Sequence, residues 1–125
     1  MNVPANLKYS SDHEWCRIEG DTAVIGITDF AQSQLGDIVF VDVPTVGETL
    51  AAGEVFGSIE AVKTVSDAFL PVGGEIVEFN EAVDAAPAVV TRDAYGEGWL
   101  VKVKMSNPAE YDALLGAADY EKLIG

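Results

Sequence analysis

Cysteine and histidine are almost absent from the sequence, which holds one of each, Cys16 and His13. A single cysteine excludes an intramolecular disulfide and any cysteine cluster that could bind zinc or an iron–sulfur centre. A histidine-rich metal site and a catalytic triad are effectively excluded in the same way, and a Cys/His pair could be built only from these two residues. We interpret them as a partly buried thiol and a surface imidazole, and we expect no metal site.

Basic residues are also few. The chain has 7 lysines and arginines against 21 acidic residues, a formal net charge of −14. Nucleic acids and anionic membranes both require a basic face, so this composition argues strongly against either as a partner. A surface this acidic keeps a protein in solution and can steer it toward basic patches on other proteins. General acidity of the host's proteins is the alternative explanation, and the two are compatible.

Long apolar runs are missing as well. No uninterrupted stretch approaches the roughly 20 residues that a helix needs to cross a bilayer. The first six residues, MNVPAN, have neither the basic start and apolar run of a secretory signal nor the Arg- and Ser-rich character of a transit peptide. We therefore expect a protein of a bacterial-type cytoplasm, with the mitochondrial matrix as the alternative. A length of 125 residues predicts one domain, over residues 1–125, with one hydrophobic core.

Short, β-branched, alternating runs separated by Gly, Pro and Asp dominate the chain. Runs of this kind are typical of strands. There are six of them: Thr22–Ile27, Ile38–Val43, Glu54–Ile59, Val65–Leu70, Glu75–Phe79 and Trp99–Lys104. Strands this short and closely spaced predict a mostly β fold, a sandwich or small barrel, rather than alternating βαβ units.

Helical signals are few and lie mostly at the end of the chain. Thr28 is placed to cap a short helix that ends at Gly36. Asn107, followed by proline, predicts another helix start, with Glu110 at the position that closes a capping box. We therefore expect a helical tail of short helices over about 107–124.

Lys63 is isolated from every other basic residue, since the nearest are Arg17 and Arg92. Strand-like runs flank it, and a hairpin bend between them would put Lys63 at or near the tip, where its long side chain projects into water. Attachment of a carrier group needs this geometry, because a modifying enzyme must reach the amine without unfolding the domain. From isolation and position alone, an ordinary solvated lysine on a turn is the simpler interpretation.

The residues around Lys63 change that interpretation. Residues 60–67, EAVKTVSD, resemble the lipoylation site of the glycine cleavage system H-protein family, whose pattern is close to E-S-V-K-A-x-S-D. Other segments resemble the family in the same order along the chain: His13–Trp15, Gly26–Asp37, Phe40–Gly47, Pro71–Val77, Tyr95–Leu100 and the helical tail. The resemblance covers nearly the whole chain, so it is far more specific than any one motif.

The resemblance implies a fold, a cofactor and a set of partners. The fold would be a lipoyl/biotinyl-type hybrid barrel-sandwich of two antiparallel sheets, and Lys63 would carry lipoate in amide linkage. The arm would shuttle the aminomethyl group from a pyridoxal-phosphate (PLP)-dependent glycine decarboxylase to a tetrahydrofolate-dependent aminomethyltransferase, and dihydrolipoyl dehydrogenase would reoxidise the dithiol. A lipoate ligase or lipoyltransferase would attach the arm. The protein would be a monomeric carrier and not an enzyme, in agreement with its lack of an evident acid, base or nucleophile constellation.

A carrier of this kind must also protect its cargo, whose amine is cationic near neutral pH and whose linkage is prone to hydrolysis. A carboxylate in a cleft near the docked arm could pair with that amine and help exclude water. The resemblance points to Glu14, Asp67 and Asp12 as arm-docking acids, and each could instead be a solvated surface acid. The helix after Thr28 often carries a histidine in relatives and has none here, so we expect no imidazole contact to the arm from that helix.

Other carriers on the same fold are the alternatives. Biotin domains flank their lysine with methionines, whereas Lys63 lies between Val62 and Thr64. Lipoyl modules of 2-oxoacid dehydrogenases favour D-K-A and lack both the Trp15 segment and the helical tail. The sequence distinguishes poorly between a glycine cleavage carrier and an H-like protein that relays lipoyl groups to other carriers. From another class, an unmodified β-sandwich interaction module would explain the strands and the acidity but not the ordered match.

Overall fold

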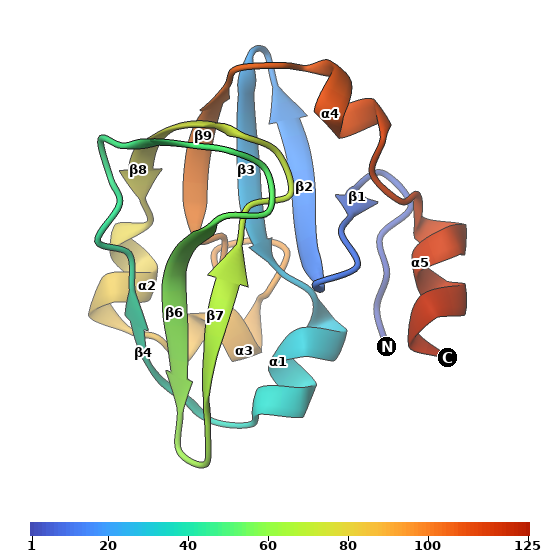
Figure 1. Ribbon diagram of the computed structural model, residues 1–125. Helices are drawn as coiled ribbons and strands as arrows, with labels where there is room; N and C mark the ends of the chain where they lie inside the picture. Colours follow the sequence, from blue (N-terminus) through green and yellow to red (C-terminus); the bar gives the residue numbers. More distant parts are fainter.

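The computed structural model describes all of residues 1–125 and contains two antiparallel sheets with short helices at their margins (Figure 1). The larger sheet has the strand order β1-β2-β3-β9-β8-β5, formed by Lys8–Tyr9, Glu14–Glu19, Thr22–Ile27, Val101–Met105, Gly74–Phe79 and Thr49–Leu50. The smaller one, here called the arm sheet, has the order β4-β6-β7, formed by Ile38–Asp42, Val55–Ala61 and Val65–Phe69. The mostly β, two-sheet fold predicted from the sequence is therefore confirmed.

Five short helices complete the fold: α1 (Asp29–Leu35), α2 (Glu81–Ala85), α3 (Val89–Arg92), α4 (Ala109–Asp112) and α5 (Ala117–Ile124). None of them is long and apolar enough to cross a membrane. Helix α1 begins as predicted, because Oγ1 of Thr28 accepts a hydrogen bond from the backbone N of Ala31 at 3.2 Å. It ends at Gly36, whose φ of 81° suits glycine.

The predicted tail is confirmed in part. Oδ1 of Asn107 accepts from the backbone N of Ala109 at 3.2 Å, as a capping residue does. The capping box was wrong: Oε1 of Glu110 instead accepts from the backbone N of Gly73 at 2.9 Å. Glu110 therefore ties the tail to the turn that precedes β8 rather than closing its own helix.

The six predicted strands correspond to β3, β4, β6, β7, β8 and β9, with ends that differ by two residues or fewer. Strand β2 was missed, because Glu14, Trp15 and Cys16 are all buried and the expected alternation is absent there. Both faces of this strand are covered, one by the main core and the other by a second apolar cluster. Helices α2 and α3 were also missed, although Asn80 caps α2 through its side chain.

The main core lies between the two sheets and contains 20 buried residues, among them Ile25 of β3, Val103 of β9 and Ile59 of β6. On the other side of β2 and β3, a smaller cluster packs beneath α5: Leu7, Tyr9, Trp15, Val24 and Tyr120. Because apolar side chains pack on both faces of β2, the strand is held firmly. Its first residue, Glu14, is therefore fixed in position.

Strands β6 and β7 form a hairpin, here called the arm hairpin, that projects beside α1 at the bottom of Figure 1. Glu60 pairs with Val65, and the backbone N of Ala61 donates to the carbonyl of Thr64 at 2.8 Å. The tip is anchored to the segment after α1, since the backbone N of Val62 donates to the carbonyl of Asp37 at 3.0 Å. Only three residues, 62–64, lie outside the two strands.

Candidate functional site

Lys63 lies exposed in the bend of the arm hairpin, so its predicted position at the tip is confirmed. Its side chain runs toward the end of α1. A Cβ atom placed on Gly36 would lie 3.4 Å from Cε of Lys63 and 3.7 Å from its Nζ. The amine is thus accessible from solvent and lies beside one wall of a cleft.

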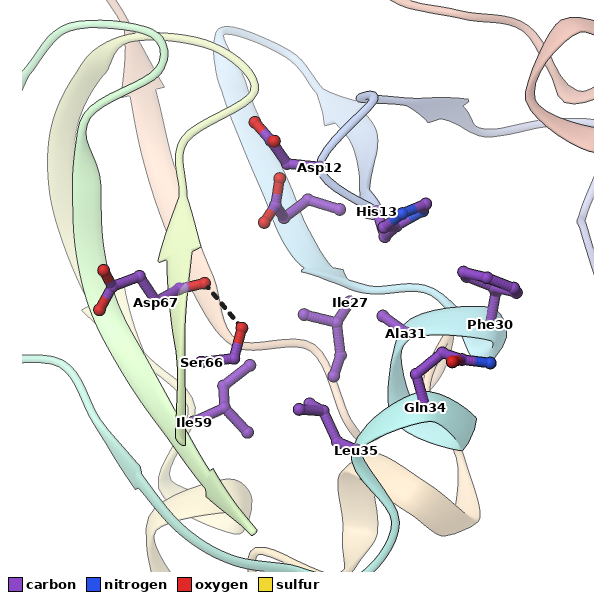
Figure 2. A pocket seen from close by; sticks show the side chains of 11 residues that line it. Asp12, His13, Ile27, Phe30, Ala31, Gln34, Leu35, Ile59, Ser66 and Asp67 are labelled. Atoms are coloured by element: carbon purple, nitrogen blue, oxygen red, sulfur yellow. Dashed lines mark hydrogen bonds between the residues drawn. The ribbon is translucent and has the colours of Figure 1, made fainter. Parts of the chain in front are cut away.

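That cleft has a volume of about 320 Å³ and runs between the arm hairpin and α1 (Figure 2). Ser66 and Ile59 line it from the hairpin, and Leu35 and Phe30 line it from α1. Its other lining residues come from the N-terminal segment, β2, β3 and the rest of α1 and β7: Asp12, His13, Glu14, Ile27, Ala31, Gln34 and Asp67. Much of the lining is apolar, and the carboxyl groups gather on the side of the N-terminal segment and β7.

Glu14 is the one buried acid of the cleft, with an exposed fraction of 2%. Both carboxyl oxygens accept hydrogen bonds, Oε1 from Oγ of Ser10 at 2.7 Å and Oε2 from the backbone N of Phe69 at 3.3 Å. Burial raises the pKa of Glu14 to about 8, against the opposing effect of these hydrogen bonds. Burial therefore favours the protonated form of this carboxyl group.

Asp12 and Asp67 line the same cleft but are exposed at its rim. Along β7, Ser66 pairs with the buried Ile59, whereas Asp67 follows it and belongs to the opposite face of the sheet. Figure 2 shows the carboxyl group of Asp67 pointing away from α1. The structure thus brings the three predicted acids to one cleft and buries only Glu14.

His13 was missed as a residue of the cleft, and its interpretation as a surface imidazole was wrong. It is partly buried, Nδ1 lies 2.9 Å from the hydroxyl of Tyr120, and its ring packs against Phe30 with centroids 4.9 Å apart. Burial lowers the pKa of His13, which favours the neutral form of the imidazole. Its place directly before Glu14 in the HEW motif was the signal that could have found it.

Cys16 was predicted to be partly buried and is fully buried. Burial raises the pKa of its thiol to about 12, so almost no thiolate forms at neutral pH. His13 and Cys16 therefore do not form a reactive pair. His13 belongs to the cleft and Cys16 to the main core.

The tail reaches the cleft through one side chain. The hydroxyl of Tyr120, on α5, lies 2.7 Å from Oγ1 of Thr28 and 2.9 Å from Nδ1 of His13. Thr28 caps α1, and His13 lines the cleft. Tyr120 therefore fixes the start of α1 and the side chain of His13 relative to each other.

Residues 7–125 match a family model described as glycine cleavage H-protein. The chain belongs to the glycine cleavage H-protein family. Membership makes the protein a lipoyl carrier of the glycine cleavage system, as the sequence motifs had predicted. Membership of this family excludes two of the alternatives named above, biotin domains and lipoyl modules of 2-oxoacid dehydrogenases.

Relatives of the H-protein family support this assignment over the whole chain. A glycine cleavage system H protein of Bacteroides fragilis is 61% identical over 124 residues, which cover 99% of this chain and 98% of the relative. One of Chlorobaculum parvum is 59% identical over 127 residues, covering 100% and 99%. The crystal structure of a glycine cleavage system H protein from Mycobacterium marinum superposes with a TM-score of 0.87 at 43% identity, covering 96% of this chain and 97% of that one.

Proposed function

We propose that the chain, as one domain over residues 1–125, carries lipoate in amide linkage on Nζ of Lys63 and passes an aminomethyl group between the enzymes of glycine cleavage. The observation that carries this proposal is the exposed Lys63 at the tip of a hairpin, beside a cleft with a buried carboxyl group. The EAVKTVSD motif and the family match support the same assignment.

The residues present fit a lipoyl arm. The amine of Lys63 is accessible for amide formation, and the apolar side chains of Phe30, Leu35 and Ile59 suit an aliphatic chain that folds back into the cleft. Once attached, lipoate would supply a disulfide that takes up the carbon unit on one sulfur, is left as a dithiol when the unit is released, and is then reoxidised by the dehydrogenase. The side chains of this protein hold the arm, pair with its cargo and exclude water.

Glu14 recognises the cargo in this proposal. An amine that enters the cleft brings a positive charge close to the carboxyl and lowers its pKa, so Glu14 loses its proton and pairs with the amine. Ser10 and Phe69 hold the carboxyl in place for this pairing. The apolar walls exclude water from the linkage, and Asp12 and Asp67 add negative potential at the rim.

The proposed partners follow from the same role. A PLP-dependent glycine decarboxylase loads the arm, a tetrahydrofolate-dependent aminomethyltransferase unloads it, and dihydrolipoyl dehydrogenase reoxidises it. A lipoate ligase or lipoyltransferase attaches the arm, and relay of lipoyl groups to other carriers would use the same Lys63. We propose a monomer of the bacterial cytoplasm that acts as a carrier and not as an enzyme. The bacterial relatives and the net charge of −14, which favours basic partner surfaces, support this view.

Reconstitution tests the proposal. Each protein is first treated with a lipoate ligase and is then mixed with the decarboxylase, the aminomethyltransferase, tetrahydrofolate, and the dehydrogenase with oxidised nicotinamide cofactor as electron acceptor, and ammonia release from glycine is measured. We expect release with the wild-type protein and with Lys104→Arg, an exposed lysine in the larger sheet. We expect none with Lys63→Arg, which keeps the charge but cannot form the amide. Ammonia release by Lys63→Arg at the wild-type rate would refute the proposal.

A further inference from the structure

A second groove, here called the α3 groove, lies between the start of β4 and α3 (Figure 1). Its lining residues are Asp37, Ile38, Ala88, Thr91 and Arg92. Its volume is about 330 Å³, against about 320 Å³ for the cleft, so it has room for the same group. None of its lining residues lines the cleft, and the two hollows are therefore separate.

The α3 groove begins beside the residue to which the arm is attached. A Cβ atom on Gly36 would lie 3.7 Å from Nζ of Lys63. Leu35, directly before Gly36, lines the cleft, whereas Asp37, directly after it, lines the groove. The carbonyl of Asp37 also accepts from the backbone N of Val62 at 3.0 Å, which holds the hairpin tip at this edge of the groove. A flexible arm on Nζ therefore has access to both hollows.

Arg92 gives the α3 groove its chemical character. It takes part in neither of the two ion pairs of the structure, so no carboxylate neutralises it. Its guanidinium group offers five N–H donors and no acceptor. Asp37 is the only other charged residue of the lining, and the buried Ile38 supplies an apolar floor. The groove thus suits an uncharged, largely apolar group that contains a hydrogen-bond acceptor.

We infer that the α3 groove is a second binding site for the lipoyl arm, occupied when the arm carries no cargo, whereas the cleft binds the aminomethyl-loaded arm. This inference rests on the proposed attachment of lipoate to Lys63. The arm is a flexible apolar chain with an amide where it joins Nζ. It bears a positive charge only while it holds the aminomethyl group, and this charge decides between the two sites.

The two sites differ in the charged groups that they present to the arm. Asp12, Glu14 and Asp67 line the cleft, and no lysine or arginine does. A cationic cargo is attracted to these carboxyl groups and repelled by Arg92. The amide carbonyl of an unloaded arm accepts hydrogen bonds from the guanidinium group, whereas carboxylates only accept hydrogen bonds and offer that carbonyl nothing. Loading therefore moves the arm from the α3 groove to the cleft.

The depth of each site suits the state of the arm that it binds. Four of the five residues that line the α3 groove are exposed, and Ile38 alone is buried. The cleft, by contrast, contains the buried carboxyl group of Glu14. The loaded linkage is thus kept from water in the cleft, whereas the sulfur atoms of an emptied arm stay at the surface, where the dehydrogenase must reach them.

Two isoleucines distinguish the sites, because Ile38 lines the α3 groove and Ile59 lines the cleft. The protein is labelled at its isoleucine methyl groups and lipoylated by a lipoate ligase. NMR then records nuclear Overhauser contacts between these methyl groups and the methylene protons of the arm. We expect the unloaded arm to contact Ile38. After loading by the decarboxylase with glycine, the contact should move to Ile59.

Filling the α3 groove tests the site itself. Ala88→Leu places a larger side chain in the groove, and Ala109→Leu makes the same change at an exposed alanine where α4 begins. The contact between the unloaded arm and Ile38 should weaken roughly five-fold or more in Ala88→Leu and less than about two-fold in the control.

The part assigned to Arg92 is tested with Arg92→Met, which keeps an unbranched side chain and removes the charge and every donor. The control is Lys122→Met, at an exposed basic residue in the last turn of α5. In Arg92→Met, the unloaded arm should lose its contact with Ile38, and the loaded arm should keep its contact with Ile59. Both contacts should persist in the control.

The outcomes separate this inference from the function on which it rests. An unloaded arm that contacts Ile59 instead of Ile38, or neither isoleucine, would overturn the inference and leave Lys63 as the carrier residue. The same holds if Ala88→Leu and Arg92→Met behave like their controls. If the ligase attaches no lipoyl group to the wild-type protein, the proposed function itself fails.

Discussion

The backbone N–H of Phe69 donates to Oε2 of Glu14 at 3.3 Å, which ties the last residue of the arm hairpin to the first residue of β2. The other carboxyl oxygen accepts from Ser10. One buried side chain therefore spans the two sheets and holds a fixed orientation in the cleft beside the arm hairpin. Glu14 links the stability of the fold to the chemistry of the site.

The raised pKa of Glu14 predicts a specific dependence of stability on pH. The folded state holds a proton that the unfolded state releases between pH 4.5, the ordinary pKa, and about 8, the folded value. The wild-type free energy of unfolding should therefore fall as pH rises through this window, relative to Glu14→Gln, by at most roughly 5 kcal/mol. Urea unfolding at pH 5, 7 and 8.5 measures the difference. Parallel pH profiles for the two proteins would show that Glu14 is not protonated in the folded state.

Glu14→Ala should shorten the lifetime of the aminomethyl-loaded protein while leaving lipoylation unchanged. Loss of the charge-assisted pairing removes an interaction of roughly 1.5–3 kcal/mol, which corresponds to a rise in hydrolysis rate of about ten-fold or more. Decay of the loaded mass over time gives the rate. Glu19→Ala, an exposed acid at the other end of β2, is the control and should decay like the wild type. Equal rates for both variants would remove Glu14 from the docking site.

Gly26→Ala should destabilise the fold through Trp15. A Cβ atom at position 26 would lie 2.6 Å from Nε1 of the fully buried indole, whose N–H donates to the carbonyl of Ala94 at 2.9 Å. Overpacking of this kind costs roughly 1–3 kcal/mol and here also threatens the hydrogen bond. Thermal unfolding measures the loss. Gly116→Ala, which adds a Cβ where no heavy atom lies within 4 Å, should change the melting temperature little.

Tyr120→Phe should weaken the attachment of the tail to the cleft. The hydroxyl serves both Thr28 and His13, and its removal leaves two groups without this partner at a cost of roughly 1–3 kcal/mol. Chemical denaturation should show this loss, and hydrogen exchange should rise at the start of α1. Tyr111→Phe, at a partly buried tyrosine of α4, is the comparison variant and should have the smaller effect. A change in Tyr120→Phe no larger than that of Tyr111→Phe would contradict the link.

The sequence predicted the elements whose signals are local. Alternation gave six strands, and the caps Thr28 and Asn107 gave two helix starts. It failed where distant packing decides the outcome. Strand β2 is buried on both faces, so it shows no alternation, and Glu110 finds its partner at Gly73, 37 residues away. Sequence patterns do not record contacts of this kind.

The candidate site shows the same difference between features set by local sequence and features set by distant contacts. The hairpin position of Lys63 could be predicted because strand-like runs flank it directly. The burial of Glu14 could not, because it depends on Ser10 and Phe69 meeting from different elements. His13 was misplaced for the same reason, since its partner Tyr120 lies 107 residues away on α5.

The intact mass of the protein after co-expression with a lipoate ligase shows whether Lys63 carries lipoate. We expect one added lipoyl mass on the wild-type protein, located by peptide mapping to Lys63, and none on Lys63→Arg. The melting temperature of Lys63→Arg should match the wild type, because an exposed residue in a bend contributes little packing. An unmodified wild-type protein under these conditions, or a lipoyl group that persists in Lys63→Arg, would show that Lys63 is not the carrier residue.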